Sequence, residues 1–146
     1  MKLLLQRVSQ ASVSVEGEEI ARIGRGILAL VGIEREDTEA QVSKLTERML
    51  NYRLFADADG KTNLSVRDIG GGVLLVSQFT LAADTRRGLR PGFSLAAAPA
   101  LAERLYERML AQLSAETVVQ IASGRFAADM QVSLINDGPV TFLLEG

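Results

Sequence analysis

The sequence of 146 residues contains no cysteine, no histidine and no tryptophan. Without cysteine the chain has no disulfide, no thiolate nucleophile and no thiolate metal ligand. Without histidine it has no Ser-His-Asp triad, and it lacks both the usual general base near neutral pH and the commonest zinc ligand. Any catalysis must therefore come from hydroxyls, carboxylates, backbone groups or the substrate itself. We expect no metal and no cofactor.

Long apolar runs and an excess of positive charge are also absent. No apolar run approaches the ~20 residues of a transmembrane helix, and the start at Met1–Leu5 has too short an apolar core for a signal peptide. We therefore expect a cytoplasmic protein with no membrane contact. The net charge is −2. A protein that grips a long stretch of nucleic acid is usually basic, so any contact with nucleic acid should be small and local.

What the sequence does contain is a high proportion of apolar residues. Their share is 47% and the mean hydropathy is +0.15, which is on the apolar side for so small a soluble protein. This composition favours a further surface that is buried in an oligomer. The length predicts a single domain over residues 1–146.

The spacing of the apolar residues predicts several strands and two helices. Residues 2–15 alternate between two faces, as a strand does. Thr38 to Gln41 has the spacing of a capping box and opens a helix over about 38–52. Pro99 suits the first turn of a second helix. Further strands are expected at 20–23, 27–31, 73–76, 117–121 and 131–135. This order favours an α+β fold over a βαβ repeat.

One charged residue is out of place in this pattern. Arg7 lies on the more apolar face of the strand predicted at 2–15. A guanidinium in that position needs a carboxylate or backbone carbonyls as partners. Alternatively, Arg7 lies near a strand end and extends its head group to water. The sequence leaves both interpretations open.

The stretch Val73–Thr80 is the strongest candidate for a site. Its apolar run predicts a buried strand, which breaks abruptly into Ser77, Gln78, Phe79 and Thr80. Polar side chains at the end of a buried strand lie where a rigid core meets an opening, which is a common place for a site. The alternative is that they only satisfy the following turn.

Two apparent motifs are rejected on their context. GRGILA at 24–29 fits the dinucleotide-binding pattern, but its glycines precede a strand-like run instead of opening a helix. DADGKTN at 57–63 superficially resembles a calcium loop, but it lacks the later ligands and the terminal glutamate. We interpret this segment as a polar turn.

Two motifs together give the chain a resemblance to a known family. SQFTL at Ser77–Leu81 and NDGPVT at Asn136–Thr141 resemble those of the D-aminoacyl-tRNA deacylases, formerly described as D-tyrosyl-tRNA deacylases. QRVSQASVSV, ADTRRGLRPGF, LYERM and GRFAADMQVSLINDGPVT also match in order, so the resemblance covers nearly the whole chain. It implies a homodimeric α+β enzyme, with largely antiparallel or mixed sheets curled into a barrel-like layer and two outer helices.

The resemblance also implies an activity and a catalytic motif. Such enzymes hydrolyse the ester that joins a D-amino acid, or glycine, to the 3′ end of a tRNA, and they reject L-aminoacyl-tRNA. By this resemblance Ser77, Gln78, Phe79 and Thr80 line the terminal adenosine and the ester.

A second motif is implied to act as the chirality filter. Gly138 and Pro139 match a Gly-cisPro motif that enters the pocket of the partner subunit, and Arg7 matches the arginine that steadies it. Phe126 and Met130 are implied to line the substrate pocket. The chain departs from the expected pattern at Ala127, where we expect glycine, and at Leu89, where we expect a more polar residue.

The chemistry expected of such a site does not need histidine, because an aminoacyl ester is an activated bond. Backbone N–H groups near Phe79 and Thr80 suit an oxyanion. We assign the Thr80 hydroxyl a positioning role, because no adjacent base is evident. The family resemblance offers the neighbouring ribose 2′-hydroxyl as the group that assists the reaction.

A loop of three arginines is the candidate contact with tRNA. Arg86, Arg87 and Arg90 are expected to meet the terminal phosphates, and a solvated basic loop is the alternative. Two other functions stay open, namely an RNA-end binding module without turnover and an esterase for small metabolite esters. The intact motifs argue against the first, and the arginine loop argues against the second.

Overall fold

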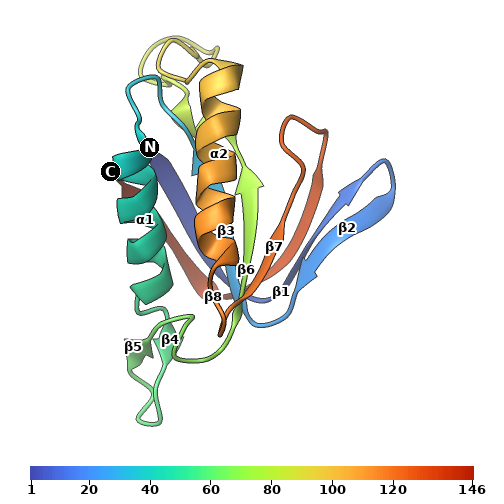
Figure 1. The fold of residues 1–146 in the computed structure, drawn as a ribbon, viewed down its shortest axis with the longest axis vertical. Helices are drawn as coiled ribbons and strands as arrows, with labels where there is room; N and C mark the ends of the chain where they lie inside the picture. The colour runs from blue at the N-terminus through green and yellow to red at the C-terminus, as the bar shows by residue number, and fades with distance from the viewer.

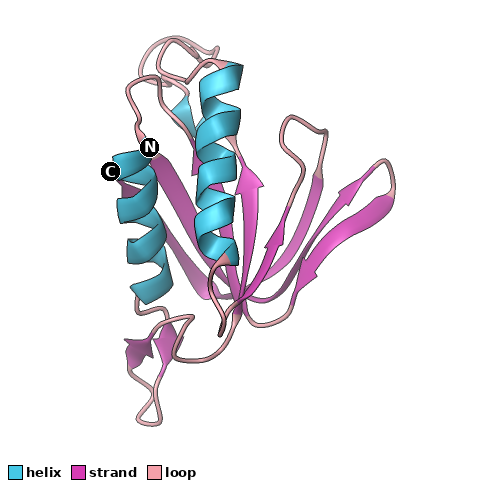
Figure 2. Ribbon diagram, viewed as in Figure 1, coloured by secondary structure: helices cyan, strands magenta, loops and turns pink.

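Two helices lie side by side against one part of a strongly curved sheet, and the remaining strands curl away from them (Figures 1 and 2). The computed structural model describes residues 1–146. The strands are β1 Lys2–Val15, β2 Glu18–Ile23, β3 Gly26–Gly32, β4 Phe55–Ala56, β5 Thr62–Leu64, β6 Gly72–Ser77, β7 Gln120–Ser123 and β8 Gln131–Glu145. The helices are α1 Glu39–Asn51, the 3-10 helix η1 Phe79–Ala82, and α2 Pro99–Ser114.

The sheet is mixed, and it is organised around the long strand β1. β8 pairs antiparallel with β1 along nearly its whole length, from Lys2↔Glu145 to Ser14↔Gln131. The other edge of β1 is shared by β3 and β2, both antiparallel. β3 then pairs in parallel with β6, and β6 in parallel with β7. The result is a nearly closed, barrel-like layer with two outer helices, which confirms the predicted fold class.

The apolar side chains form two cores, one on each side of β3 and β6. The larger core has 22 buried residues and lies between the sheet and the two long helices. The smaller core has 8 buried residues on the other face of the sheet. Val73 and Leu75 belong to the first core, whereas Leu74 and Val76 belong to the second. β6 is therefore buried on both faces, which explains its uninterrupted apolar run.

The first helix begins as the sequence predicts. The Thr38 side chain accepts from the Ala40 N–H, and the Gln41 side chain accepts from the Thr38 N–H at 2.9 Å. These contacts satisfy N–H groups that have no partner within the helix. The two acceptors are the side chains of Thr38 and Gln41, the positions that the capping-box pattern predicts.

The end of the chain differs from the sequence-based prediction. A strand at 131–135 followed by a separate segment is expected, but β8 runs without interruption from Gln131 to Glu145. Glycine and proline at 138–139 usually weaken or end a strand. Here the pairing with β1 continues past them, with irregular register near Val8. Another shift is found at β7, which begins at Gln120 and not at Thr117.

No helix in the structure is both long enough and apolar enough to cross a membrane.

Candidate active site

The polar residues that follow β6 are placed by its parallel pairing with β3. The Gln78 N–H donates to the Val31 carbonyl at 2.7 Å, which extends the ladder in which Val31 pairs with Ser77. η1 follows immediately and lies on the end of β3. A Cβ on Gly32 would lie only 2.6 Å from the Leu81 Cβ. Glycine at position 32 is therefore needed for this close approach.

A cavity of about 520 Å³ opens at this end of the sheet. Ser77, Gln78 and Phe79 form one part of its wall. The rest comes from Val76 of β6, Val31 of β3 and Ile33 directly after it, Ala97, Pro99 and Ala102 around the start of α2, Phe126–Met130 before β8, and Val132 of β8. Most of these residues are apolar, and Asp129 is the one carboxylate among them. A small ligand with a largely apolar group fits such a wall.

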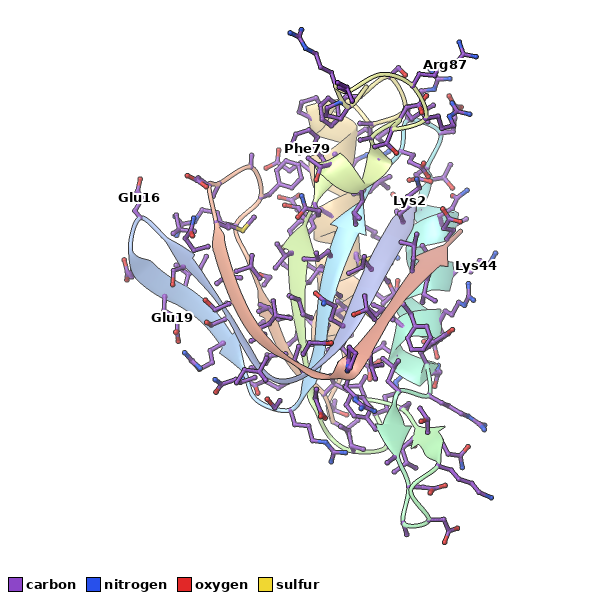
Figure 3. The ribbon with its side chains drawn as sticks, turned by 180° about the vertical axis from the view of Figure 1, so that it is seen from behind. Lys2, Glu16, Glu19, Lys44, Phe79 and Arg87 are labelled. Carbon is purple, nitrogen blue, oxygen red and sulfur yellow. The ribbon has the colours of Figure 1, made fainter.

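An aromatic pair stands at the mouth of this region. The Phe79 side chain is 60% exposed, and its ring centroid lies 5.1 Å from that of Phe93. Figure 3 shows Phe79 at the same end of the molecule as Arg87, which lies in the loop between η1 and α2. An exposed ring beside a cavity offers a flat surface on which a nucleobase can stack.

The start of η1 provides backbone donors. The first N–H groups of a helix have no acceptor within it, and the N-cap residue Gln78 makes no side-chain cap. Its amide instead donates to the Thr80 hydroxyl. The N–H groups of Phe79 and Thr80 donate to no other backbone group. Thr80 is exposed and lies outside the cavity wall.

The segment before β8 closes the cavity from the other side, and it has an unusual backbone. Ala127 has a φ of 61°, in the left-handed region that favours glycine. Glycine is the residue that the family resemblance predicts here. Nearby, a Cβ on Gly124 would lie 2.6 Å from the Met130 sulfur. The Met130 side chain therefore depends on glycine at position 124 for its place.

A buried tyrosine supports the cavity wall. The Tyr106 hydroxyl of α2 donates to the Leu75 carbonyl at 3.2 Å, and its ring centroid lies 5.7 Å from that of Phe126. Burial raises the pKa of Tyr106 to about 12, and a hydrogen bond with Ser123 partly opposes this. The side chain is therefore neutral at physiological pH.

The Gly138–Pro139 motif lies in the bend of β8, away from the cavity of its own chain. Its peptide bond is cis, which confirms the conformation expected from the family resemblance. The Arg7 Nε donates to the Asp137 carbonyl at 2.8 Å, and Nη1 donates to the Leu54 carbonyl at 2.8 Å. The partners that an arginine on an apolar face needs are thus mainly backbone carbonyls, with the Asp137 carboxylate at 3.5 Å.

The three arginines of the loop between η1 and α2 are all exposed. The Arg86 guanidinium pairs with the Asp84 carboxylate at 2.7 Å, and this contact holds the pKa of Asp84 far below its usual range. Arg87 and Arg90 have no carboxylate within ion-pairing distance. The charge that this loop offers to a ligand therefore comes mainly from Arg87 and Arg90.

The structure brings together part of the set of site residues that the sequence predicts. Five of them line the cavity, namely Ser77, Gln78, Phe79, Phe126 and Met130. Thr80 lies next to the wall, hydrogen-bonded to Gln78. The remaining predicted residues lie outside the wall, namely Arg7, Gly138, Pro139, Arg86, Arg87 and Arg90. Sequence reasoning missed the contribution of β3 and of the start of α2. Only Pro99, which marks the helix start, gave a signal for this part of the wall.

No group of three or more Asp, Glu, His or Cys side chains is arranged to hold a metal ion. A mostly apolar cavity thus lies beside backbone N–H groups that have no backbone acceptor. The family model described as D-Tyr-tRNA(Tyr) deacylase matches residues 4–145. The chain belongs to this family.

Relatives and solved structures agree with this assignment. The chain is 62% identical over 146 residues to "D-aminoacyl-tRNA deacylase" of Pseudomonas savastanoi pv. phaseolicola (strain 1448A / Race 6). It is 60% identical over 145 residues to the protein of the same name from Azotobacter vinelandii (strain DJ / ATCC BAA-1303). Each comparison covers 99% of both chains.

Two solved structures have the same fold. A structure titled "c-Myc DNA Unwinding Element Binding Protein" superposes with a TM-score of 0.95 at 44% identity, covering 100% of this chain and 99% of the other. A probable eukaryotic D-amino acid tRNA deacylase superposes with a TM-score of 0.84 at 16% identity, covering 98% and 97% of the two chains. The second likeness concerns the fold alone.

Proposed function

We propose that this protein hydrolyses the ester bond between a D-amino acid and the 3′-terminal ribose of tRNA. The observation that carries the proposal is the cavity at the end of β6, where Ser77, Gln78 and Phe79 meet Phe126 and Met130. The family assignment over residues 4–145 and the printed names of the relatives support it. The amino acid enters the cavity, and the terminal adenine stacks on the exposed Phe79 ring.

The chemical step uses the backbone at the start of η1. When water attacks the carbon of the ester carbonyl, the carbonyl oxygen gains negative charge. The N–H groups of Phe79 and Thr80 stabilise this charge, because they have no acceptor within η1 and fixed donors need little reorganisation. The ester then breaks, so that the carboxyl group leaves with the free amino acid and the 3′-oxygen takes a proton.

Thr80 acts as a positioning residue in this mechanism. Its hydroxyl accepts a hydrogen bond from the Gln78 amide, and no carboxylate contacts it as a base. The neighbouring 2′-hydroxyl of the terminal ribose assists the reaction, because the chain has no histidine and Asp129, the one carboxylate of the cavity wall, makes no hydrogen bond to the Thr80 hydroxyl, whose partner is the Gln78 amide.

The preference for D-amino acids depends on Gly138–Pro139 of a second copy of the chain. Proline offers no N–H, and glycine offers no Cβ, so that backbone carbonyls stand close to the substrate. Arg7 holds the segment through the Asp137 carbonyl at 2.8 Å. In the partner's cavity the motif leaves no room for an L side chain. Glycine has no side chain to exclude, so glycyl-tRNA is accepted as well.

The functional unit is accordingly a homodimer. The exposed apolar side chains of β8 fit this role, with Ile135 53% exposed and Leu143 50% exposed. Exposed apolar residues on the strand that carries Gly138–Pro139 favour pairing through this part of the molecule. The tRNA end approaches over the loop between η1 and α2, where Arg87 and Arg90 meet its phosphates.

The test is an ester-hydrolysis assay with matched pairs of D- and L-aminoacyl-tRNA. We expect the D-ester to be lost much faster than in buffer and the L-ester to be lost at the buffer rate. Binding of both tRNAs without ester loss would contradict the proposal. Equal hydrolysis of both enantiomers would contradict the chirality filter alone.

A further inference from the structure

A second cavity lies on the other side of the molecule, between the C-terminal part of α1 and β8. It is a shallow depression, open to solvent, with a volume of about 740 Å³. It is lined by Lys44, Glu47, Arg48 and Asn51 of α1, by Tyr52 and Arg53 directly after it, and by Phe142 of β8. We call it the α1–β8 cleft. We propose that this cleft binds the phosphate backbone of the tRNA acceptor end.

The charge of the cleft is the first reason. It contains three cationic side chains in a protein whose net charge is −2. Neither Lys44 nor Arg48 has a carboxylate within ion-pairing distance, and Lys44 extends outward from α1 (Figure 3). Arg53 donates to the neutral Asn63 amide oxygen at 2.9 Å. Unpaired cations gathered in one place match a ligand that carries several negative charges.

The single carboxylate of the cleft does not cancel this charge. Glu47 is held at 2.7 Å by the Arg67 guanidinium, from outside the cleft. It also accepts from the Asn51 side-chain amide at 2.6 Å. These contacts lower the pKa of Glu47, with the hydrogen bond from Arg67 as the largest cause. Arg67 also pairs with Glu116 at 2.6 Å, so it offsets only part of the Glu47 charge. The cleft still has three cations against one carboxylate, and neither Lys44 nor Arg48 is paired with Glu47.

Two aromatic rings give the cleft an affinity for bases as well. Tyr52 and Phe142 meet edge to face, with ring centroids 5.7 Å apart. The Arg48 guanidinium lies 5.8 Å from the Tyr52 ring centroid. Phe142 is 42% exposed, and an exposed ring beside cations is the usual arrangement for holding an unpaired nucleotide.

The position of the cleft favours the tRNA end over other polyanions. Arg53 and Leu54 are neighbours in the chain, and Arg7 connects the Leu54 carbonyl to the Asp137 carbonyl, each at 2.8 Å. The cleft therefore adjoins Gly138–Pro139. This step rests on the proposed function, in which Gly138–Pro139 enters the cavity of the partner subunit. In that homodimer the cleft lies beside the partner's catalytic cavity. A tRNA whose 3′ end enters that cavity passes close to the cleft.

The experiment measures binding of uncharged tRNA to the Lys44→Gln/Arg48→Gln double variant over a range of salt concentrations. Glutamine keeps the helix propensity of α1. Each phosphate contact contributes about 0.7–0.9 to the slope of log K against log salt, so the slope should fall by about 1.4–1.8 for two contacts. The KM for D-aminoacyl-tRNA should rise about tenfold with kcat unchanged.

Lys61→Gln is the matched control. Lys61 is an exposed lysine in the turn between β4 and β5, outside the cleft, and its loss should leave the slope and the KM unchanged. Phe142→Leu tests the rings separately. This substitution should weaken binding about fivefold or more without changing the slope.

A minimal substrate separates this proposal from the proposed function. D-aminoacyl-adenosine carries no phosphate, so the double variant and the unsubstituted protein should hydrolyse it equally. If neither protein hydrolyses it or D-aminoacyl-tRNA, the proposed function fails, whereas the measurements with uncharged tRNA still decide the cleft. An unchanged slope in the double variant overturns the proposal. If the double variant differs from the unsubstituted protein in its mass in solution but binds tRNA equally well, the proposal is also overturned, and the cleft is assigned to a protein interface.

Discussion

At the scale of single residues, Ala127 has the most unfavourable backbone position in the cavity wall. An alanine at a φ of 61° costs roughly 1–2 kcal/mol more than in the right-handed region. Glycine avoids this cost but loses about 0.4–1 kcal/mol through the greater freedom of the unfolded chain. The balance favours glycine, which the family pattern also predicts.

We predict that Ala127→Gly raises the free energy of unfolding by about 0.5–1 kcal/mol, and the melting temperature by about 1–4 °C. Urea unfolding and calorimetry measure the two quantities. Ala128→Gly is the matched control, because Ala128 does not have a positive φ. That variant should be less stable than the unsubstituted protein. A destabilised Ala127→Gly protein would contradict the interpretation.

Thr80 is the residue whose role most directly tests the mechanism. If its hydroxyl positions the substrate, Thr80→Ala should keep measurable D-aminoacyl-tRNA hydrolysis. A substrate whose terminal ribose lacks the 2′-hydroxyl should react at a small fraction of the normal rate in either protein. Single-turnover kinetics with both substrates measure these effects. Capture of an acyl group on Thr80 would show that it attacks the ester itself.

Arg7 shows how far a single residue can be understood from the sequence. A guanidinium on an apolar strand face predicts backbone or carboxylate partners, and the structure supplies the carbonyls of Leu54 and Asp137. The sequence alone did not identify these carbonyls, because they come from chain segments 47 and 130 residues away. Asp129 gave no comparable signal, since an exposed aspartate in a loop is common.

At the scale of elements, the contact between α2 and β6 depends on Tyr106. Its hydroxyl donates to the Leu75 carbonyl, which also accepts from the Gly124 N–H at 2.9 Å. Leu75 therefore keeps a partner when the hydroxyl is removed. Tyr106→Phe should lower the free energy of unfolding by only about 0.5–1.5 kcal/mol.

The same substitution should change how stability depends on pH. The pKa of Tyr106 is raised to about 12 in the folded state, above its value of about 10 in an unfolded chain. The neutral form is thus favoured by folding. The resulting stability is fully present below pH 10 and is lost as the pH rises toward 12. The difference between the unsubstituted protein and Tyr106→Phe should shrink over this range in urea titrations. A constant difference would contradict the assignment.

Helices and strands were predictable from the sequence where residues close together in the chain determine them. The capping box at Thr38 and the buried run at 73–76 marked α1 and β6 close to their observed positions. β8 was not predicted in full, because glycine and proline normally end a strand, whereas its pairing with β1 continues on both sides of them. That pairing is a property of the whole sheet, and no local pattern contains it.

At the scale of the whole molecule, the cavity wall explains why the site was only partly predictable. Its residues come from β3, β6, η1, α2, the segment before β8, and β8 itself. The parallel pairing of β3 with β6 brings them together. The two sequence motifs mark where the chain enters the site, but the tertiary arrangement decides which apolar residues complete it.

The proposed dimer gives a prediction at the same scale. Ile135→Lys/Leu143→Lys should reduce the mass in solution from twice the chain mass of 15.7 kDa to a single chain, because two buried cations oppose association. Light scattering measures this mass. Discrimination between D- and L-aminoacyl-tRNA should fall together with it. Leu89→Lys, in the exposed loop, should change neither quantity. A monomeric variant that still discriminates would contradict the cross-subunit filter.

The uninterrupted course of β8 has a consequence for how this protein can change during evolution. One strand supplies a wall of the cavity at Val132, the filter at Gly138–Pro139 and a ring of the cleft at Phe142. Because side chains alternate along a paired strand, inserting or deleting one residue in either paired stretch, 131–136 or 141–145, turns the later side chains of that stretch to the opposite face. Lineages descended from a common ancestor should therefore accumulate insertions in the loop between η1 and α2 while keeping the length from residue 131 to residue 145 constant.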